Sequence, residues 1–310
     1  MKRIILDCDP GHDDMIAIML ATSSPEIELL GITTVAGNQT GEKTFKNALR
    51  ILTLIGEDTP VSRGFDKPMV RELTVAPRIH GVSGLDGANL PEATVKDTGK
   101  HATDFIIETL LASDEPVTLV PTGPLTNVAF SLLKKPSIKE KIEEIVLMGG
   151  AIYDSNITPA SEFNIYVDPE AASIVFNSGI PITMVGLDVT NKAVFTFEDI
   201  EKIGKMGGHV SSVVAPLLEF FAKANLEIFG IEGAPLHDPL TVAYLIDRDV
   251  LETRSLRVDI ETMGEYTSGR TVVDVYGVTG KEANASVATN VNVEKFKTMI
   301  FDALERLDKR

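Results

Sequence analysis

The stretch "RIILDCDPGHDDMIAIMLATS" (residues 3–23) places a short apolar strand, a Pro-Gly turn and an apolar helix in immediate succession. "RIIL" (3–6) has the length and apolar content of a buried strand, and "MIAIMLATS" (15–23) is the helix predicted to follow the turn. Four aspartates, with no lysine or arginine among them, lie around the turn: Asp7, Asp9, Asp13 and Asp14. The stretch therefore predicts a strand–helix unit whose turn concentrates negative charge.

The rest of the chain repeats this alternation of strand and helix. Apolar runs of strand length occupy residues 27–37, 116–123, 142–150 and 181–190. Helical patterns occupy residues 48–56, 102–113, 124–135, 168–179 and 293–310. Alternating helices and continuously apolar strands are typical of a mostly parallel sheet that is covered on both faces. No linker or repeat divides the sequence, so we expect a single α/β domain over residues 1–310, with a Rossmann-like central sheet flanked by helices.

The composition excludes several classes of function. The 310 residues carry a formal net charge of −16, which would repel a phosphate backbone or an anionic membrane, so we expect neither nucleic acid nor membrane as a partner. Cys8 is the only cysteine, which excludes an internal disulfide. The apolar start ends at Asp7, too soon for a signal peptide, and no apolar run approaches the roughly 18 residues of a membrane span. We therefore expect a cytoplasmic protein.

Oxygen-bearing side chains follow the predicted strands. A parallel sheet binds its ligand outside the carboxyl ends of the strands, and there the sequence places Asp7, Asp9, Asn38, Thr122 and Asp188. Helix capping, at about 0.3–1 kcal/mol per group, would explain one or two aspartates in the turn. Four crowded carboxylates repel one another, and a hard cation such as Mg²⁺ or Ca²⁺ would relieve that repulsion. The turn is therefore a candidate metal site.

An Asp-Pro dipeptide opens two of the helical patterns. In "LHDPLTVAYLI" (236–246), Asp238 is a candidate helix cap and the following proline suits the first helical position. "VDPEAASIVF" has the same pattern at Asp168, so the pattern alone does not indicate function. His237, directly before Asp238, is either an ordinary surface histidine or a catalytic group.

Two further polar segments have both a structural and a functional interpretation. Asn156, Glu162 and Asn164 lie beside a predicted strand, either as ordinary loop residues or as hydrogen-bonding groups for a polyhydroxylated ligand. The glycine-rich segment "RIHGVSGLDGANLPE" (78–92) contains His80 and matches no dinucleotide or phosphate-loop fingerprint. It is either a surface loop or a lid over the carboxyl ends of the strands.

Taken together, several motifs resemble one known family. "LDCDPGHDD" is similar to the DxDPGxDD signature of the nucleoside hydrolases of the inosine–uridine-preferring type. The resemblance continues, in the order of the family and over nearly the whole chain, through "TTVAGN", "VPTGPLTN", "VLMGG", "SEFNIYVDPEA", "MVGLDVT" and "HDP". It implies the nucleoside hydrolase fold and a calcium-dependent hydrolysis of ribonucleosides to free ribose and a nucleobase. It also implies a homo-oligomer, either a dimer or a tetramer.

The resemblance also implies roles for individual residues. Ca²⁺ would be held by Asp9, Asp14, the main-chain oxygen of Thr122, and Asp238. Asp9 would be the general base for the attacking water, and His237 the proton donor to the departing base. The substrate-binding residues would be Asp13 and Asn164, with Asp238, at the 2′- and 3′-hydroxyls, Asn156 and Glu162 at the 5′-hydroxyl, and Asn38 and Met148 near the ribose. Apart from the resemblance, the interpretation of segment 78–92 as a lid makes His80 a further candidate substrate-binding residue.

The base preference and two rival functions stay open at this point. The family usually carries a tyrosine in the helix before HDP, where it contacts the base, but "LLEFFAKANLEIFG" (217–230) has Phe220 and Phe221 and no tyrosine. A Mg²⁺-dependent phosphatase of the haloacid dehalogenase type would use Asp7 and Asp9 as nucleophile and acid. A non-catalytic nucleoside- or sugar-binding protein is the second alternative.

Overall fold

A nine-stranded sheet forms the centre of the computed structural model, which describes residues 1–310. The strand order is β10-β9-β11-β6-β5-β4-β1-β2-β3. The strands from β11 to β3 are parallel, whereas β9 pairs antiparallel with β11 and with β10. The strands are β1 (Lys2–Cys8), β2 (Ile27–Thr34), β3 (Val61–Arg63), β4 (Val117–Pro121), β5 (Ile142–Met148), β6 (Ile182–Val185), β9 (Leu251–Ile260), β10 (Thr271–Asp274) and β11 (Ala285–Val291). The predicted α/β class with a mostly parallel sheet is confirmed.

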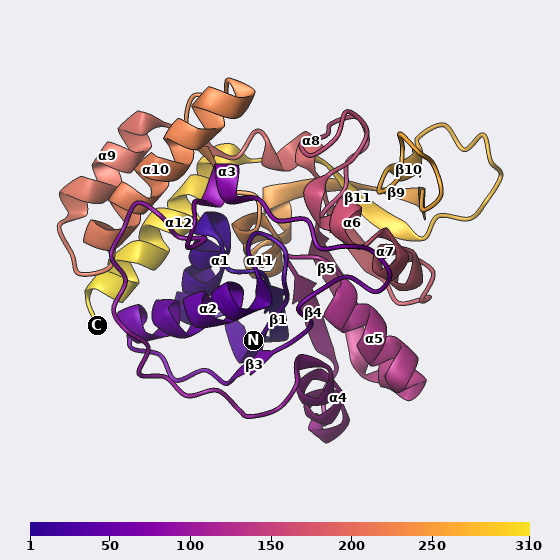
Figure 1. The fold of residues 1–310 in the computed structure, drawn as a ribbon, viewed down its shortest axis with the longest axis horizontal. Coiled ribbons are helices and arrows are strands. Elements are labelled where there is room, and N and C mark those ends of the chain that lie inside the picture. Colours follow the sequence, from indigo (N-terminus) through magenta and orange to yellow (C-terminus); the bar gives the residue numbers. More distant parts are fainter.

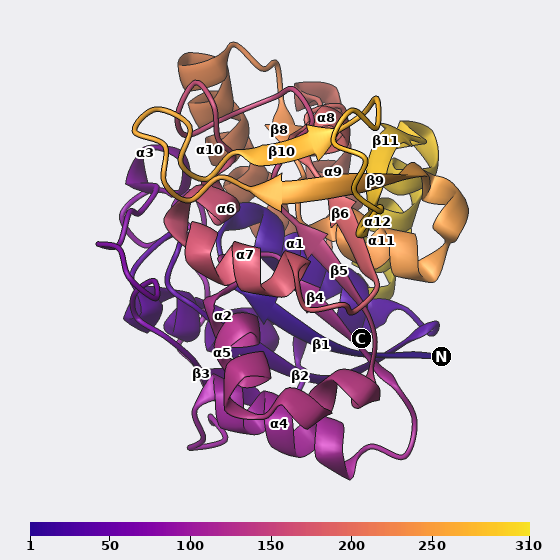
Figure 2. The ribbon, with the colours of Figure 1, turned by 90° about the vertical axis from the view of Figure 1, so that its right-hand side faces the viewer.

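Helices cover both faces of this sheet (Figure 1 and Figure 2). Helices α1 (His12–Ser23), α2 (Gly41–Ile55), α11 (Pro239–Ile246) and α12 (Val293–Asp308) contribute to a core of 49 buried residues on one face. Helices α4 (Ala102–Ala112), α5 (Thr126–Lys134) and α7 (Pro169–Phe176) contribute to a core of 28 buried residues on the other. Along β1, Ile4 and Leu6 face the first core and Ile5 faces the second. Both faces of the strand are buried, which explains its continuously apolar sequence.

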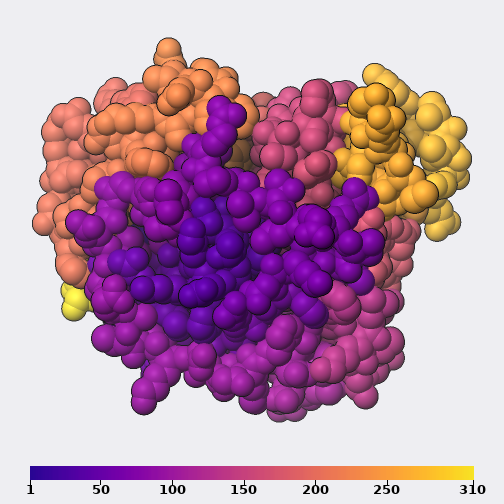
Figure 3. Space-filling view, in the orientation of Figure 1, coloured from indigo at the N-terminus to yellow at the C-terminus, as the bar shows by residue number.

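The remaining elements lie around the carboxyl ends of the parallel strands. They are the short helices α3 (Pro77–His80), α6 (Phe163–Val167) and α8 (Leu187–Thr190), the longer helices α9 (Phe197–Met206) and α10 (Ser211–Phe229), and a small sheet of β7 (Val194–Phe195) and β8 (Ala234–Pro235). Two short 3₁₀ helices span Pro136–Lys141 and Arg248–Val250. In the space-filling view the purple segment around α3 lies at the surface beside the orange α10 (Figure 3). None of the helices combines the length and the apolar content that crossing a bilayer requires.

Two predicted segments differ from the structure. The run 181–190 ends as strand β6 at Val185 and continues as helix α8. Asp188 in that helix accepts hydrogen bonds from the backbone N–H groups of Ile152 and Tyr153 at 2.6 and 2.9 Å, so it fixes the loop after β5 and does not line the pocket at the strand ends. The expected strand beside Glu162 is the short helix α6, because the Glu162 carboxylate accepts from backbone N–H groups of the first helical turn.

Candidate active site

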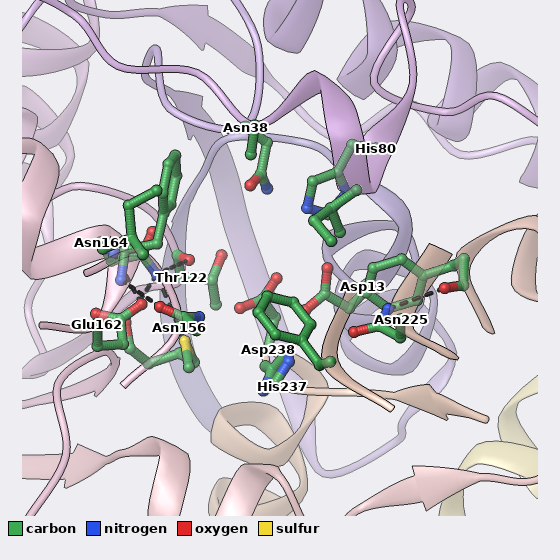
Figure 4. Close-up of a pocket in the computed structure, with 17 residues that line it drawn as sticks. Asp13, Asn38, His80, Thr122, Asn156, Glu162, Asn164, Asn225, His237 and Asp238 are labelled. Carbon is green, nitrogen blue, oxygen red and sulfur yellow. Dashed lines mark hydrogen bonds between the residues drawn. The ribbon is translucent and has the colours of Figure 1, made fainter. Parts of the chain in front are cut away.

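A pocket lies at the carboxyl ends of the central strands (Figure 4). Its lining comes from the first turn of α1, from α3 and the residue before it, from segments that follow β2, β4 and β5, from α10, and from the residues directly before α11. It includes most of the residues that the sequence indicates for a site: Asp13, Asn38, His80, Thr122, Met148, Asn156, Glu162, Asn164, His237 and Asp238. Asp9 and Asp14 are buried and do not line the pocket, but they hydrogen-bond its lining residues Asn38 and Thr122.

Three carboxylates form a compact group beside this pocket. Oxygen atoms of Asp13, Asp14 and Asp238 all lie within 4.8 Å of one another, and all three side chains are buried. Burial raises the pKa of each carboxyl group, to about 7 for Asp13 and well above the usual range for Asp238. The neighbouring carboxylates add to the rise in pKa for Asp13 and Asp238. The group therefore concentrates negative charge that no lysine or arginine compensates.

Asp9 lies outside this compact group but next to it. Its Oδ2 accepts a 2.6 Å hydrogen bond from the backbone N–H of Asn38, whereas its Oδ1 is buried without a hydrogen-bond partner. Burial, and then repulsion by Asp14, raise the pKa of Asp9 well above its usual range. Leaving a polar oxygen buried and unpaired is costly, so Asp9 Oδ1 is an atom that a bound cation or a water molecule would satisfy.

These oxygen donors fit a hard divalent cation. Such ions bind carboxylate and carbonyl oxygens, and they remove the repulsion among the carboxylates that hold them. Asp14 is oriented toward the group by hydrogen bonds from the Gly11 N–H (2.9 Å), the Asn38 amide (3.1 Å) and the Thr122 hydroxyl (2.9 Å). The buried donors and the unpartnered Asp9 oxygen are therefore consistent with a metal site at the predicted position.

Asn164 connects the ends of two strands at the pocket. Its Nδ2 donates to the main-chain oxygens of Thr122 and Met148 at 2.8 and 3.1 Å. Because both amide hydrogens are directed at these carbonyl groups, Asn164 Oδ1 is the atom left for a ligand. The Thr122 carbonyl oxygen keeps a second lone pair for a ligand, and the hydroxyl of the same residue donates to Asp14 at 2.9 Å.

Glu162 and Asn156 combine a structural role with a place in the pocket wall. The Glu162 carboxylate accepts from the backbone N–H groups of Gly150, Asn164 and Ile165 at 2.8, 2.8 and 3.1 Å. Burial nevertheless raises its pKa to about 7. Asn156 Oδ1 accepts from the Phe163 N–H at 2.9 Å, which leaves its Nδ2 for a ligand. Figure 4 shows Glu162, Asn156 and Asn164 together at one end of the pocket.

His237 lies at the pocket directly before Asp238. Its Nδ1 is 2.8 Å from the hydroxyl oxygen of Thr190, so Nε2 is the ring nitrogen available to a ligand. Burial lowers the pKa of His237 to about 4, and the imidazole is therefore neutral at neutral pH.

At the opposite end of the pocket, the sequence indicated the stretch 217–230 with Phe220 and Phe221, but it did not indicate Asn225 or Phe229. There Phe221, Asn225 and Phe229 of helix α10 line the wall near His80. The Asn225 amide nitrogen donates to the Phe221 main-chain oxygen at 2.9 Å, which leaves Oδ1 directed into the pocket (Figure 4). The helical spacing of four between these residues is the signal that could have found them.

Asp7 is wrongly placed among the ligand-facing residues by the sequence analysis. Its side chain is buried within the sheet, where it accepts from the Thr33 hydroxyl at 2.6 Å and from the Asn127 amide at 2.7 Å. Along a strand, successive side chains face opposite sides, and Asp7 is held between β1, β2 and α5. It joins these elements below the site and does not line the pocket.

Comparisons with known proteins agree on one family. The model of the inosine-uridine preferring nucleoside hydrolases matches residues 4–298. The chain is 52% identical over 304 residues to a pyrimidine-specific ribonucleoside hydrolase RihA of Escherichia coli, covering 97% of this chain and 98% of the relative. It is also 52% identical, over the same length and coverage, to RihA of Shigella flexneri.

Solved structures give the same result. The fold is similar to that of a purine-preferring ribonucleoside hydrolase from Gardnerella vaginalis, with a TM-score of 0.93, 36% identity and 99% of both chains covered. An inosine-uridine preferring nucleoside hydrolase from Bacillus anthracis, at 22% identity and a TM-score of 0.82 over 99% of this chain and 100% of the other, shows the shared fold alone. These findings set aside the phosphatase and the non-catalytic binding protein. The chain belongs to the inosine-uridine preferring nucleoside hydrolase family, and it is a ribonucleoside hydrolase.

Proposed function

We propose that this enzyme hydrolyses the N-glycosidic bond of pyrimidine ribonucleosides, such as uridine and cytidine, with Ca²⁺ as its metal. The observation that carries the proposal is the group of buried carboxylates beside the pocket, with one Asp9 oxygen that has no partner in the chain. The relatives that are 52% identical are named pyrimidine-specific, which supports the choice of base.

Asp9, Asp14, Asp238 and the main-chain oxygen of Thr122 are the proposed calcium ligands. Asp13 is the third member of the compact carboxylate group, and it lines the pocket, so we assign it to the ribose hydroxyls. A calcium ion bound by these ligands would orient the attacking water and lower its pKa.

Asp9 is the proposed general base. Its Oδ2 is held by the Asn38 N–H, so Oδ1 is free to take a proton from the water. The water oxygen forms the new bond to C1′ while the C1′–N bond breaks, and the electron pair of that bond leaves with the base. The ribosyl group becomes positively charged in this transition state.

The remaining polar residues hold the ribose in the proposal. Asp13, Asn164 and Asp238 bind the 2′- and 3′-hydroxyls, and Asn156 and Glu162 bind the 5′-hydroxyl. Asn38 and Met148 border the sugar. Carboxylates that contact ribose hydroxyls stabilise the positively charged transition state more than the neutral substrate, and this difference is what accelerates the reaction.

His237 is proposed to donate a proton to the departing base. With the Thr190 hydroxyl at Nδ1, a neutral His237 can carry its proton on Nε2, toward the pocket. It then donates a hydrogen bond to the departing base, which stabilises the negative charge that develops there. Full transfer of a proton to the base requires the imidazolium form, which returns to the neutral imidazole in the step, and the negative charge on the base favours that form against the burial that lowers the pKa of His237.

The aromatic end of the pocket is proposed to hold the base. Phe221 and Phe229 offer apolar walls, and Asn225 Oδ1 offers an acceptor. Uracil and cytosine each carry an N–H group that such an acceptor binds. In this proposal, Phe221, Asn225 and Phe229 of α10 take the role of the tyrosine that the family commonly carries in the helix before HDP.

The test is the release of free ribose from uridine, cytidine and inosine in calcium buffer without phosphate. We expect uridine and cytidine to be cleaved with a higher kcat/KM than inosine, and treatment with a chelator to stop ribose release until Ca²⁺ is added back. Because phosphate is absent, ribose release cannot come from a phosphorylase. A higher kcat/KM for inosine would contradict the pyrimidine preference, and full activity after removal of all metal would contradict the calcium dependence.

We also propose that the enzyme is a homo-oligomer, a dimer or a tetramer, as the family resemblance implies. Light scattering on the purified protein measures its mass in solution. A mass near 33.5 kDa, that of one chain, would contradict the proposal.

A further inference from the structure

His12 is a fully buried histidine to which the proposed reaction gives no role. It begins helix α1, and its ring stacks on Phe220 and Phe221, with centroid distances of 5.6 and 5.1 Å and interplanar angles of 6° and 8°. No carboxylate hydrogen-bonds the ring, so a charged imidazolium there would be unpaired in apolar surroundings. The ring is therefore neutral and carries one proton.

Two contacts decide which nitrogen carries that proton. His12 Nε2 lies 2.8 Å from the main-chain oxygen of Asp86, which can only accept, so the proton is on Nε2. His12 Nδ1 is therefore an acceptor, and it lies 3.2 Å from Nδ1 of His80. Two bare nitrogens would repel at this distance, so His80 carries its own proton on Nδ1. The backbone N–H of His12 also approaches His80 Nδ1, but at 3.4 Å the contact is longer than an ordinary hydrogen bond.

This assignment fixes what His80 presents to the substrate. His80 lines the pocket, and burial lowers its pKa well below the usual range, so it too is neutral. With the proton on Nδ1, its Nε2 is bare and directed toward the pocket (Figure 4). His80 therefore offers the substrate an acceptor, whereas the other tautomer would offer a donor.

Asp86 belongs to the segment 78–92, which is held against helix α2. Side chains of the segment leading into α2 and of the helix itself donate to its main-chain oxygens: Gln39 to Gly81 at 2.9 Å, Lys43 to Val82 at 2.6 Å and Asn47 to Ser83 at 3.0 Å. Arg50 of α2 also donates to the main-chain oxygens of Leu90 and Pro91, and His12 adds a further contact, to Asp86. Unlike those side chains, His12 also contacts the ring of His80, which lines the pocket.

We propose that His12 is a positioning residue for His80. By donating a hydrogen bond to Asp86, His12 holds His80 in the tautomer whose bare Nε2 accepts a hydrogen bond from an N–H or O–H group of the nucleoside. The proposal rests on the proposed function, in which His80 contacts the substrate. The proposal also links the position of segment 78–92 to the pocket. While this segment is packed against α2, the contact with Asp86 keeps the proton of His12 on Nε2, and His80 therefore offers the substrate an acceptor.

The imidazole ¹⁵N NMR spectrum tests the tautomers without reference to activity. In the parent enzyme we expect His80 to show a protonated Nδ1 and a bare Nε2, with its signals assigned by their loss in His80→Gln. His12→Phe keeps the aromatic packing and removes both nitrogens, and it should release His80 to a mixture of tautomers. His209→Phe, at an exposed histidine, is the control and should leave the His80 signals unchanged. A protonated Nε2 on His80 in the parent would overturn the proposal, even if His12→Phe does not fold.

A double-mutant cycle on uridine hydrolysis tests whether His12 acts through His80. We expect His12→Phe to lower kcat/KM by up to about tenfold, the effect of one misplaced hydrogen bond. In a His80→Gln background the same change should have no further effect, and His209→Phe should match the parent. Additive losses would show that His12 acts independently of His80 and would overturn the proposal. If the enzyme fails to cleave uridine at all, the proposed function fails while the NMR result still decides the tautomer.

Discussion

Helices α7 and α11 begin with the same dipeptide, Asp-Pro, and use the aspartate in opposite ways. The Asp168 carboxylate accepts from the Ala171 N–H at 3.0 Å, the Met69 N–H at 2.9 Å and the Thr126 hydroxyl at 2.6 Å. The Asp238 carboxylate makes no capping bond to its helix and instead lies with two other carboxylates. Both side chains are buried. The sequence pattern is shared, but only one of the two carboxylates is satisfied by the chain.

The difference between these helix starts shows in the pKa of each aspartate. Burial raises the pKa of both carboxyl groups. At Asp168, hydrogen bonds from Thr126, Ala171 and Met69 oppose the rise. At Asp238, neighbouring carboxylates add to it. A buried carboxylate without donors requires a proton or a cation, so the missing cap at Asp238 indicates a functional residue where the sequence alone shows a helix start.

The largest expected effect follows from removing the Asp238 charge. Asp238→Asn should lower kcat/KM for uridine by about 10²–10⁴-fold, because loss of a metal ligand removes several kcal/mol of transition-state stabilisation. Its thermal stability in the absence of calcium should equal or exceed that of the parent, since one of three repelling carboxylates is gone. Steady-state kinetics and a thermal melt check both expectations. Activity within tenfold of the parent would mean that Asp238, like Asp168, is not needed for catalysis.

The residue before each aspartate sharpens the comparison. Val167 precedes Asp168 and is buried in the protein, whereas His237 precedes Asp238 and lines the pocket. His237→Ala should slow uridine hydrolysis by roughly 10²–10⁴-fold, the usual contribution of a general acid. Hydrolysis of p-nitrophenyl riboside, whose phenolate leaves without a proton, should stay close to the parent rate. An equal loss on both substrates would refute proton donation by His237.

The two Asp-Pro starts also show how far the sequence could predict this molecule. Apolar runs predicted the parallel strands because those strands are buried on both faces, and the crowded aspartates predicted a charged site at their ends. Periodicity could not show that Asp7 Oδ1 is held by Thr33 and Asn127 within the sheet, because hydrogen bonds between distant segments leave no local signal. For the same reason the sequence did not indicate Asn225 or the contact between His12 and His80.

Calcium should stabilise the protein, and more strongly at higher pH. Burial raises the pKa of the proposed calcium ligands Asp9, Asp14 and Asp238 and, from its usual 3.8 to about 7, that of the neighbouring Asp13. A carboxyl group with a raised folded-state pKa stabilises the fold fully below its unfolded pKa, and that contribution is lost as the pH rises through about 7. The metal-free protein should therefore lose stability as the pH rises from about 4 to about 7.

Calcium binds the ionised carboxylates and should offset this loss. At a free concentration of about 100 times Kd it should add about 2.7 kcal/mol of stability. The rise in Tm on adding Ca²⁺, measured by thermal melts in calcium and in chelator, should be larger at pH 8 than at pH 5. The effect should persist in Asp168→Ala and disappear in Asp238→Asn. A calcium shift of the same size at both pH values would contradict the role of these carboxyl groups.

The smallest expected effect is the loss of the satisfied cap. Asp168→Ala removes the cap of α7 and leaves the Met69 N–H and the Thr126 hydroxyl without their acceptor, which should cost about 1–3 kcal/mol of the free energy of unfolding. Asp168→Asn keeps one acceptor oxygen and should cost less. Because Asp168 lies outside the pocket, kcat and KM for uridine per folded molecule should match those of the parent in both variants. Denaturant unfolding measures the stability, and kinetics at a temperature where all variants are folded measures the activity. If Asp168→Ala instead lost activity to the extent expected of Asp238→Asn while remaining folded, the division between a structural and a functional Asp-Pro helix start would be wrong.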